Sequence, residues 1–324
     1  MGVTSEPKYF FEHFSSMLTK RYSNEVHLSS FLSELELAFH WMTSNCDCEF
    51  LTTAGGCVVL FVERQSSSMK FGFFVIPAKQ TEADELWASL ISKAKSKGIQ
   101  KLSGPIQGNT FFPYRFISKT DGSPFFKGEY FSDGRDHEFM MSQFPASVNE
   151  YVTGRRDYFD GIMEVSKPYF DKAVDQGLEI RKYSEVDVPL FKEVFELVGK
   201  IFGDNWSFSH LTEAELMAVY QNEFGAKSKL VLHTYHLEGK MIGFCRFIEE
   251  NDETLICKTL GVLPEYQKLG LGNAAVYEFH KDAKELGYSK MYYALIFVKN
   301  RVKQNMPKDD AEFFRHYASY EFEW

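Results

Sequence analysis

Two glycines lie in the segment Gln267-Lys-Leu-Gly-Leu-Gly272, between a run typical of a β-strand and a run typical of a helix. Backbone N–H groups at the start of a helix, with the helix dipole behind them, form a binding site for an anion. Glycine lets the backbone approach that anion closely and adopt conformations that a Cβ atom would forbid. We therefore expect a phosphate-binding turn here, with a tight structural turn as the alternative interpretation.

The elements around this turn follow from apolar runs and their end signals. A strand is predicted over Thr254–Val262 and ends at Pro264, because proline cannot donate to a sheet ladder. A helix is predicted over Asn273–Leu286 and ends at Gly287, since glycine accepts the left-handed conformation that closes helices. The next strand is expected over Tyr288–Val298.

The first half of the chain repeats this order of elements. In each half, antiparallel strands end at a proline, a helix follows, a glycine closes it and another strand begins, from Pro77 to Gly98 and from Pro264 to Gly287. We therefore expect an α+β fold with two similar domains, each a mixed, mostly antiparallel sheet flanked by helices, over residues 1–165 and 166–324. Strands are expected at 57–63, 70–76, 99–106, 178–183, 230–236, 241–249 and 313–324, and helices at 26–43, 82–96, 188–201 and near 167–174.

Length and charge bound the function. A chain of 324 residues corresponds to two domains at about 150 residues each. The net charge is −9, so the chain lacks the positive electrostatic field that nucleic-acid binding requires, and we expect no nucleic-acid partner. The longest uncharged stretch, Phe50 to Val62, is too short to span a membrane, so we expect no membrane partner. The 32 phenylalanines indicate large cores or a deep apolar pocket.

The cysteines point to a reduced compartment. They are five, an odd and sparse set, and the N-terminus lacks an apolar signal-peptide core, so we expect a cytoplasmic protein. Cys46-Asp-Cys48 has no second Cys or His pair at zinc-like spacing, so we expect no metal. Residues 108–134 are rich in aromatic residues, Gly and Pro, which indicates either a packed excursion over a ligand cleft or a satellite hydrophobic cluster.

The segment Thr259-Leu-Gly-Val-Leu-Pro-Glu-Tyr-Gln-Lys-Leu-Gly-Leu-Gly272 resembles the acyl-CoA-binding motif of the GNAT N-acetyltransferase superfamily. The resemblance covers residues 178–300 by order of elements and extends to the first half by topology alone, so the chain is similar to a tandem GNAT protein. It implies an N-acyltransferase that uses acetyl-CoA or another acyl-CoA as co-substrate and acts on a small-molecule or amino-terminal amine, as a monomer or homodimer.

The resemblance also implies the cofactor-binding residues. Leu260 and Val262, with Gly261 between them, would offer backbone groups to the pantetheine arm. Amides of the turn would hold the pyrophosphate, and Asn300 matches a position where the family often places a cofactor-contacting Asn. The turn residues so implied are Gln267, Lys268, Leu269, Gly270, Leu271 and Gly272, with Asn273 opening the helix.

The first half departs from this motif. Pro77-Ala-Lys-Gln-Thr-Glu-Ala-Asp84 contains no glycine and two acidic residues, which would repel a pyrophosphate at the start of a helix. We therefore expect the N-terminal domain to lack cofactor binding and to serve as a scaffold or to supply walls of a substrate cleft.

The sequence also contains candidates for the catalytic acid and base. Attack of an amine on a thioester needs a base for the amine proton and a donor for the leaving thiolate. In the family a Tyr near the chain end often serves as that donor, which makes Tyr317 and Tyr320 candidates, and we favour Tyr317. A packed sheet tyrosine is the alternative for either one. Glu249, Glu250, Glu253 and His210 are all open as the base, and Lys258 is unusual within an apolar strand.

The sequence therefore leaves three hypotheses for the function, of which the first is the leading one. The first is an acyl-CoA-dependent N-acyltransferase working by direct attack of a primary amine. The second is a non-catalytic acyl-CoA-binding sensor, and the third is an interaction module in which Gly270 and Gly272 are turn glycines. Binding of acyl-CoA separates the third from the others, and turnover separates the first from the second.

Overall fold

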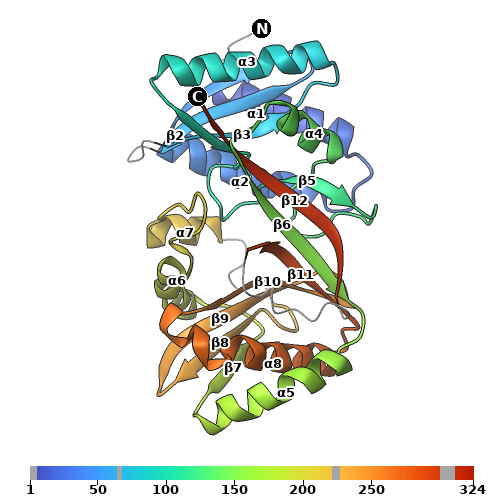
Figure 1. Ribbon diagram of the computed structural model, residues 1–324, viewed down its shortest axis with the longest axis vertical. Coiled ribbons are helices and arrows are strands. Elements are labelled where there is room, and N and C mark those ends of the chain that lie inside the picture. The colour runs from blue at the N-terminus through green and yellow to red at the C-terminus, as the bar shows by residue number, and fades with distance from the viewer. Residues whose placement is uncertain (1–5, 64–67, 221–226, 300–310) are drawn as a thin grey trace. The chain divides into compact units, whose positions relative to one another are not determined.

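The computed structural model describes residues 6–63, 68–220, 227–299 and 311–324 and consists of two compact units (Figure 1). Unit 1 contains Met1–Glu150 and His316–Trp324, and unit 2 contains Tyr151–Arg315. The division lies at Glu150 instead of the expected residue 165, and the C-terminal segment belongs to unit 1 instead of the second domain. Two strands, β6 (Ser147–Arg156) and β12 (Glu312–Glu323), each have residues in both units.

Unit 1 is built on a sheet in the order β1-β2-β3-β4-β12. Neighbouring strands are antiparallel except β3 and β4, which are parallel. Its other elements are α1 (Pro7–Arg21), α2 (Leu28–Asn45), β1 (Cys46–Thr52), β2 (Cys57–Glu63), β3 (Met69–Val75), α3 (Gln80–Ser96), β4 (Lys101–Gly104), β5 (Phe116–Thr120) and α4 (Gly134–Ser142).

Helices cover both faces of this sheet. α3 lies on one face, and α1 and α2 lie on the other (Figure 1). Every residue of β3 is buried as a result. Several phenylalanine rings pack together between this sheet and α1 and α2, with ring centroids 5–7 Å apart. The cluster includes Phe10, Phe14, Phe39, Phe50 and Phe73.

Unit 2 has the sheet order β6-β11-β10-β9-β8-β7. β10 and β11 are parallel, and the other neighbouring pairs within this unit are antiparallel. Its other elements are α5 (Asp160–Asp175), β7 (Glu179–Tyr183), α6 (Val188–Phe202), α7 (Glu213–Val219), β8 (Leu232–Leu237), β9 (Lys240–Glu249), β10 (Thr254–Val262), the 3-10 helix η2 (Pro264–Leu269), α8 (Leu271–Glu285) and β11 (Lys290–Phe297).

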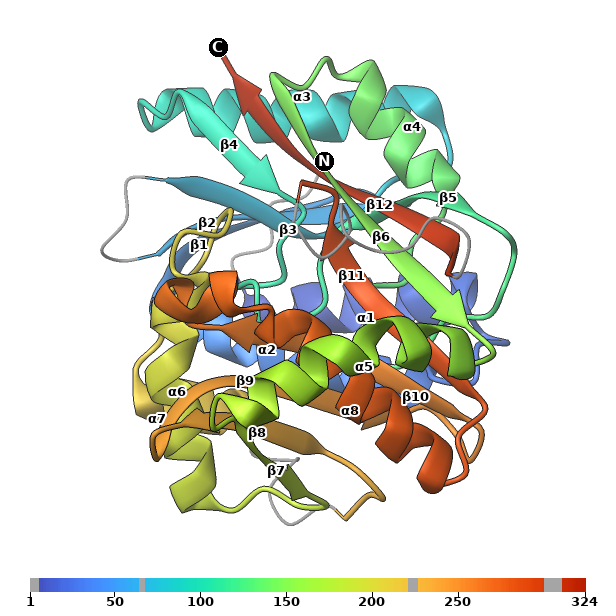
Figure 2. The same ribbon diagram turned by 60° about the horizontal axis from the view of Figure 1, so that its bottom comes forward.

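The core of unit 2 lies between its sheet and a pair of helices. α5 and α8 run side by side on one face (Figures 1 and 2), and Ala274 and Phe279 of α8 join Leu255 and Cys257 of β10 in one buried cluster. α6 packs against the strands from the other face, where Ile201 approaches Gly261. The α+β class and the mixed sheets predicted for both domains are confirmed by this arrangement.

The aromatic excursion of residues 108–134 is packed within unit 1. Phe131 stacks on Phe31 of α2 at a centroid distance of 4.1 Å, and Phe126 and Tyr130 are fully buried. These contacts agree with the satellite cluster that was one of the two interpretations of this segment.

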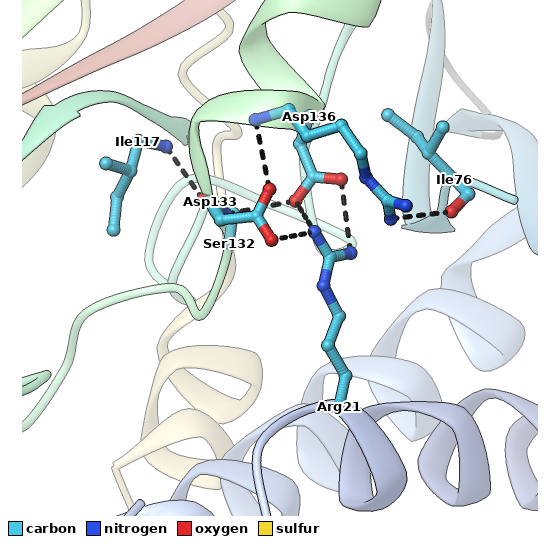
Figure 3. Close-up of polar contacts among 7 residues, drawn as sticks. Arg21, Ile76, Ile117, Ser132, Asp133 and Asp136 are labelled. Atoms are coloured by element: carbon cyan, nitrogen blue, oxygen red, sulfur yellow. Dashed lines mark hydrogen bonds and ion pairs between the residues drawn. The ribbon is translucent and has the colours of Figure 1, made fainter. Parts of the chain in front are cut away.

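A polar contact fixes the end of the excursion to α1 (Figure 3). Arg21 donates to Asp133 at 2.5 Å and to both carboxylate oxygens of Asp136, at 2.9 and 3.2 Å. Asp133 and Asp136 form the capping box that starts α4. Burial raises the pKa of Asp136, whereas Arg21, against the opposing effect of burial, holds the pKa of Asp133 below its usual value. The guanidinium therefore joins α1 to the start of α4.

His280 on α8 belongs to a second buried polar network. Its Nδ1 lies 2.6 Å from the carbonyl oxygen of Val276, which can only accept, so Nδ1 carries the proton. Its Nε2 then accepts from the Tyr293 hydroxyl at 2.5 Å, and that hydroxyl accepts from Arg156 Nε at 3.0 Å. Burial, with a smaller contribution from Arg156, lowers the pKa of His280 to about 3.

We expect this depressed pKa to make unfolding pH-dependent. The unfolded chain binds a proton at the ordinary histidine pKa of about 6.5, whereas the folded chain does not until about 3, so stability is full above pH 6.5 and falls below it. Between pH 7 and pH 5 the part of this loss that His280 contributes should be about 2 kcal/mol in denaturant titrations. His280→Gln should flatten this dependence, while His40→Gln, an exposed site, should keep the wild-type slope. Equal slopes for wild type and His280→Gln would contradict the assignment.

Candidate functional site

The predicted phosphate turn is a left-handed glycine between two helices. Gly270 has a φ of +76° and separates η2 from α8. A side chain there would be strained, and its Cβ would also lie 3.4 Å from Tyr169 Cδ1. α8 begins at Leu271, two residues before the predicted start at Asn273. The glycine is thus required by the backbone conformation of the turn.

The start of α8 has the features of an anion site. The first N–H groups of any helix lack partners within it, and among the described residues no side chain caps this end. Its first turn also contains no acidic residue. Apart from the neighbouring residues and the backbone of α8 itself, no described atom lies within 4 Å of the position that a Cβ on Gly272 would take. In the described structure, the helix dipole therefore acts at a helix end that has neither a capping side chain nor an acidic residue in its first turn.

Strand β10 supplies a free edge beside the turn. β10 and β11 pair in parallel from Thr254 with Lys290 to Cys257 with Tyr293, and in the described part of unit 2 their pairing ends there. β10 continues along β9 as far as Val262. Among the described strands, none therefore pairs with this edge of β10 after Cys257.

The direction of the peptide groups on this edge follows from one hydrogen bond. Leu263 N–H donates to the Ile242 carbonyl at 2.8 Å, so Leu263 faces β9. Peptide groups alternate along a strand, so Gly261 also faces β9, whereas Leu260 and Val262 face away from it. An extended ligand with amide groups can pair with such an edge as an added strand does.

Gln267 contributes through its side chain as well as its backbone. Its Nε2 donates to the Val262 carbonyl at 3.0 Å. This bond joins the turn to the end of β10. The motif predicts a role only for the backbone of Gln267, and no spacing signal in the sequence identifies this side-chain contact.

The other residues predicted to bind cofactor are distributed around these two features. Leu260, Gly261 and Val262 lie on β10, and Gly261 is also required for packing, because its Cβ would lie 2.8 Å from Phe202 of α6. The amide of Asn273 already donates to the Gly270 carbonyl at 3.0 Å. The backbones of Gln267, Lys268 and Leu269 form η2, and Leu271, Gly272 and Asn273 form the first turn of α8. Asn300 lies outside the described residues.

Lys258, unusual within an apolar strand, coincides with a β-bulge. The register of β10 against β9 shifts between Cys257, which opposes Phe247, and Thr259, which opposes Arg246. Lys258 is therefore the extra residue of the bulge, and it follows the last residue that pairs with β11. A bulge of this kind redirects a strand and ends pairing.

Unit 1 has the same elements but a closed strand edge. β3 pairs in parallel with β4 at Met69 and Lys70, and the chain after β4 then runs along β3. Ile106 N–H donates to the Phe71 carbonyl at 2.9 Å, and Gln107 Oε1 accepts from Phe73 N–H at 2.6 Å. A Cβ on Gly72 would lie 1.8 Å from the Ile106 carbonyl oxygen. The peptide groups of β3 that correspond to the free edge of β10 are therefore occupied by the chain itself.

The helix that follows β3 also differs from α8. α3 begins at Gln80 and has Glu82 in its first turn, and Glu82 pairs with Lys79 at 3.0 Å. The negative charge at this helix end opposes a phosphate. Both features of the candidate site in unit 2 are thus absent from the described part of unit 1.

The candidate general acids lie in unit 1. The Tyr317 hydroxyl is buried and donates to Glu129 Oε1 at 2.5 Å. The Tyr320 hydroxyl is also buried and lies 2.7 Å from His137 Nδ1. Among the candidate bases, Glu249 accepts from Ser228 Oγ at 2.7 Å. A catalytic role for Tyr317 stays a prediction, and these contacts do not select a base.

Two further findings concern metals and membranes. Cys46 and Cys48 lie at the start of β1 and form no disulfide within the described residues. Within the described ranges, no three or more His, Cys, Asp or Glu side chains are grouped so that they could hold a metal ion. No helix in the described part of the chain is both long enough and apolar enough to cross a bilayer.

Comparison with known proteins identifies the class of unit 2. Residues 191–308 match the model of the Acetyltransferase (GNAT) family, and the match contains β10, the glycine turn and α8. The chain carries a GNAT domain in unit 2, as the motif predicted. No curated protein matches the sequence.

Solved structures extend the likeness to both units. A tandem GNAT protein from the clavulanic acid biosynthesis pathway has a TM-score of 0.53 at 10% identity, and the alignment covers 98% of this chain and 95% of that one. A probable N-acyltransferase from Enterococcus faecalis V583 has a TM-score of 0.55 at 11% identity, with 98% and 72% covered.

A third similar structure is longer. It is a GCN5-related glucosamine N-acetyltransferase region in a fungal multi-domain β-N-acetylglucosaminidase, with a TM-score of 0.57 at 10% identity. The alignment covers 99% of this chain but only 38% of that one. At such identities these likenesses show the fold alone, and the fold is that of a tandem GNAT protein, which confirms the arrangement expected from the sequence.

Proposed function

We propose that this protein is an acyl-CoA-dependent N-acyltransferase whose unit 2 binds the acyl-CoA. The observation that carries the proposal is the edge of β10 beyond Cys257, which pairs with no described strand and leads to a left-handed glycine and a helix start without a capping side chain. One ligand that combines amide groups on an extended arm with a pyrophosphate matches both features. Acetyl-CoA is such a ligand.

The residues of unit 2 have separate tasks in this proposal. Peptide groups of Leu260 and the N–H group of Val262 bind the amides of the pantetheine arm, so the arm extends along β10. N–H groups of Gly270, Leu271 and Gly272, with the dipole of α8, bind the pyrophosphate. Gln267 holds the turn against the strand through the Val262 carbonyl.

The reaction is direct transfer to a primary amine of a small molecule or a polypeptide N-terminus. The amine nitrogen attacks the thioester carbonyl carbon, a C–N bond forms and the C–S bond breaks. One proton leaves the amine nitrogen for a base, and one proton reaches the departing thiolate sulfur. Holding the thioester in place along β10 lowers the barrier by orienting the carbonyl before attack.

A non-catalytic acyl-CoA-binding sensor is the second candidate. The Tyr317 hydroxyl directs its proton to the buried carboxylate of Glu129, and it must turn away from Glu129 before it can protonate a thiolate. If Tyr317 keeps this contact, its role is structural. Turnover with an amine acceptor distinguishes the enzyme from the sensor.

The anion site can be tested by adding charge at Gly272, the second residue of α8. Gly272→Asp should fold normally, because an Asp in the first turn stabilises a helix and no described atom obstructs its Cβ. Acetyl-CoA at a hundred times its Kd should stabilise wild type by about 2.7 kcal/mol. In thermal melting this shift should disappear in Gly272→Asp, because the carboxylate repels the pyrophosphate.

Two matched controls accompany this measurement. Gly272→Ala should keep the shift, because a methyl group adds no charge. Thr81→Asp, at the same position of α3 in unit 1, should also keep it, because this helix end binds no cofactor in the proposal. If acetyl-CoA still produced the full melting shift in Gly272→Asp, the result would contradict pyrophosphate binding at the start of α8.

The role of Tyr317 can be separated from that of its neighbour. If Tyr317 protonates the thiolate, Tyr317→Phe should lower kcat by about 100-fold or more while leaving the acetyl-CoA melting shift unchanged. Tyr320→Phe, which also removes one buried hydroxyl contact, should lower stability by about 1 kcal/mol and leave kcat unchanged. Equal kcat in the two variants would leave Tyr317 a structural partner of Glu129.

A further inference from the structure

Strand β11 contains a bulge that faces a single residue of β6. Tyr293 opposes Gly154, and Ile296 opposes Val152. Two residues of β11, Ala294 and Leu295, therefore stand opposite one residue of β6, Thr153. An extra residue of this kind bends its strand and changes its direction.

Leu295 adopts a conformation that is unfavourable for its side chain. Its φ is +58°, in the left-handed region that residues other than glycine rarely occupy. Its N–H donates to Thr153 Oγ1 at 3.1 Å, and Thr153 is completely buried. The hydroxyl of Thr153 thus satisfies the amide of the strained residue.

The bulge lies where β11 leaves β10. The last parallel pair is Cys257 with Tyr293, and the bulge begins with the next residue of β11. β10 has its own bulge at Lys258, immediately after Cys257. Beyond these points β10 follows β9 and β11 follows β6 (Figure 2). The two irregularities separate the strands and leave the edge of β10 free.

We infer that Thr153 is a positioning residue for acyl-CoA binding. Its hydroxyl holds Leu295 in the bulge, which keeps β11 against β6 and away from Leu260 and Val262. Without this hydroxyl the bulge relaxes, β11 moves toward β10, and the edge becomes less available to the pantetheine arm. The inference rests on the proposed function of that edge.

Three variants test the contact itself. Thr153→Val keeps the shape of the side chain but cannot accept the Leu295 N–H, whereas Thr153→Ser keeps the acceptor. The double variant Thr153→Val with Leu295→Gly removes the acceptor and the strain together, because glycine adopts a positive φ freely. Thr234→Val is the matched control, since Thr234 is also fully buried in unit 2 and its Oγ1 lies 2.9 Å from His236 Nε2.

The measurement is the Kd for acetyl-CoA by calorimetry, with thermal melting of each variant. Thr153→Val should bind about tenfold more weakly than wild type, and Thr153→Ser should bind like wild type. The double variant should recover most of the affinity. Thr234→Val should melt lower with no change in Kd. Recovery on adding Leu295→Gly is a result that a general loss of stability does not produce.

A second readout, which requires no ligand, is hydrogen exchange of peptides that contain residues 293–297. Their exchange should be faster in Thr153→Val, and the double variant should return toward wild type. Unchanged exchange, or an unchanged Kd in Thr153→Val, overturns the inference while the proposed function stands. Failure of wild type to bind acetyl-CoA overturns the proposed function instead.

Discussion

The site depends on the separation of two parallel strands. Peptide N–H and C=O groups in a sheet must find partners, and a strand that loses its neighbour presents a row of them to its surroundings. In unit 2, β10 and β11 pair over four positions and then part at a bulge in each strand. The free edge of β10 leads directly to the Gly270 turn and the start of α8. The strand edge and the helix end thus form one continuous series of backbone groups, to which we propose that the acyl-CoA binds.

The two units differ in what pairs with the peptide groups of their parallel strands. Unit 1 also has a pair of parallel strands, but after β4 the chain continues along β3, where Ile106 and Gln107 bond to peptide groups of Phe71 and Phe73. Its helix α3 carries Glu82 where α8 has an uncharged first turn. In unit 1 the chain itself therefore bonds to this edge of β3. In the described part of unit 2, the corresponding edge of β10 has no partner strand. This contrast is the strongest structural reason to place the cofactor in unit 2.

Local signals predicted the elements that form the site. The bounds of β10 are those expected from its apolar run and from Pro264, and the helix after it began two residues early because Gly270, not Asn273, sets its start. The acidic first turn of the helix in unit 1 was visible in the sequence. The strand expected at 99–106 ends at Gly104, before Pro105, which has no N–H to donate.

The remaining features depend on contacts between distant segments. α1 was missed although Phe10, Phe14 and Leu18 recur at helical spacing and are buried. β6 was missed because Gly154 interrupts its apolar pattern, and the entry of the chain end into unit 1 depends on the pairing of β12 with β4. The closure of β3 by Ile106 and the contact of Thr153 with Leu295 likewise join residues with no sequence signal. Such contacts appear only in the folded chain.

The most direct test of the account is a comparison of hydrogen exchange in the two units with and without saturating acetyl-CoA. We expect slower exchange in peptides covering residues 258–273 and no change in peptides covering residues 70–84, because in the second set Ile106 and Gln107 already bond to β3 and Glu82 lies in the first turn of α3. Protection of residues 70–84, or no protection of residues 258–273 under conditions in which acetyl-CoA binds, would contradict it.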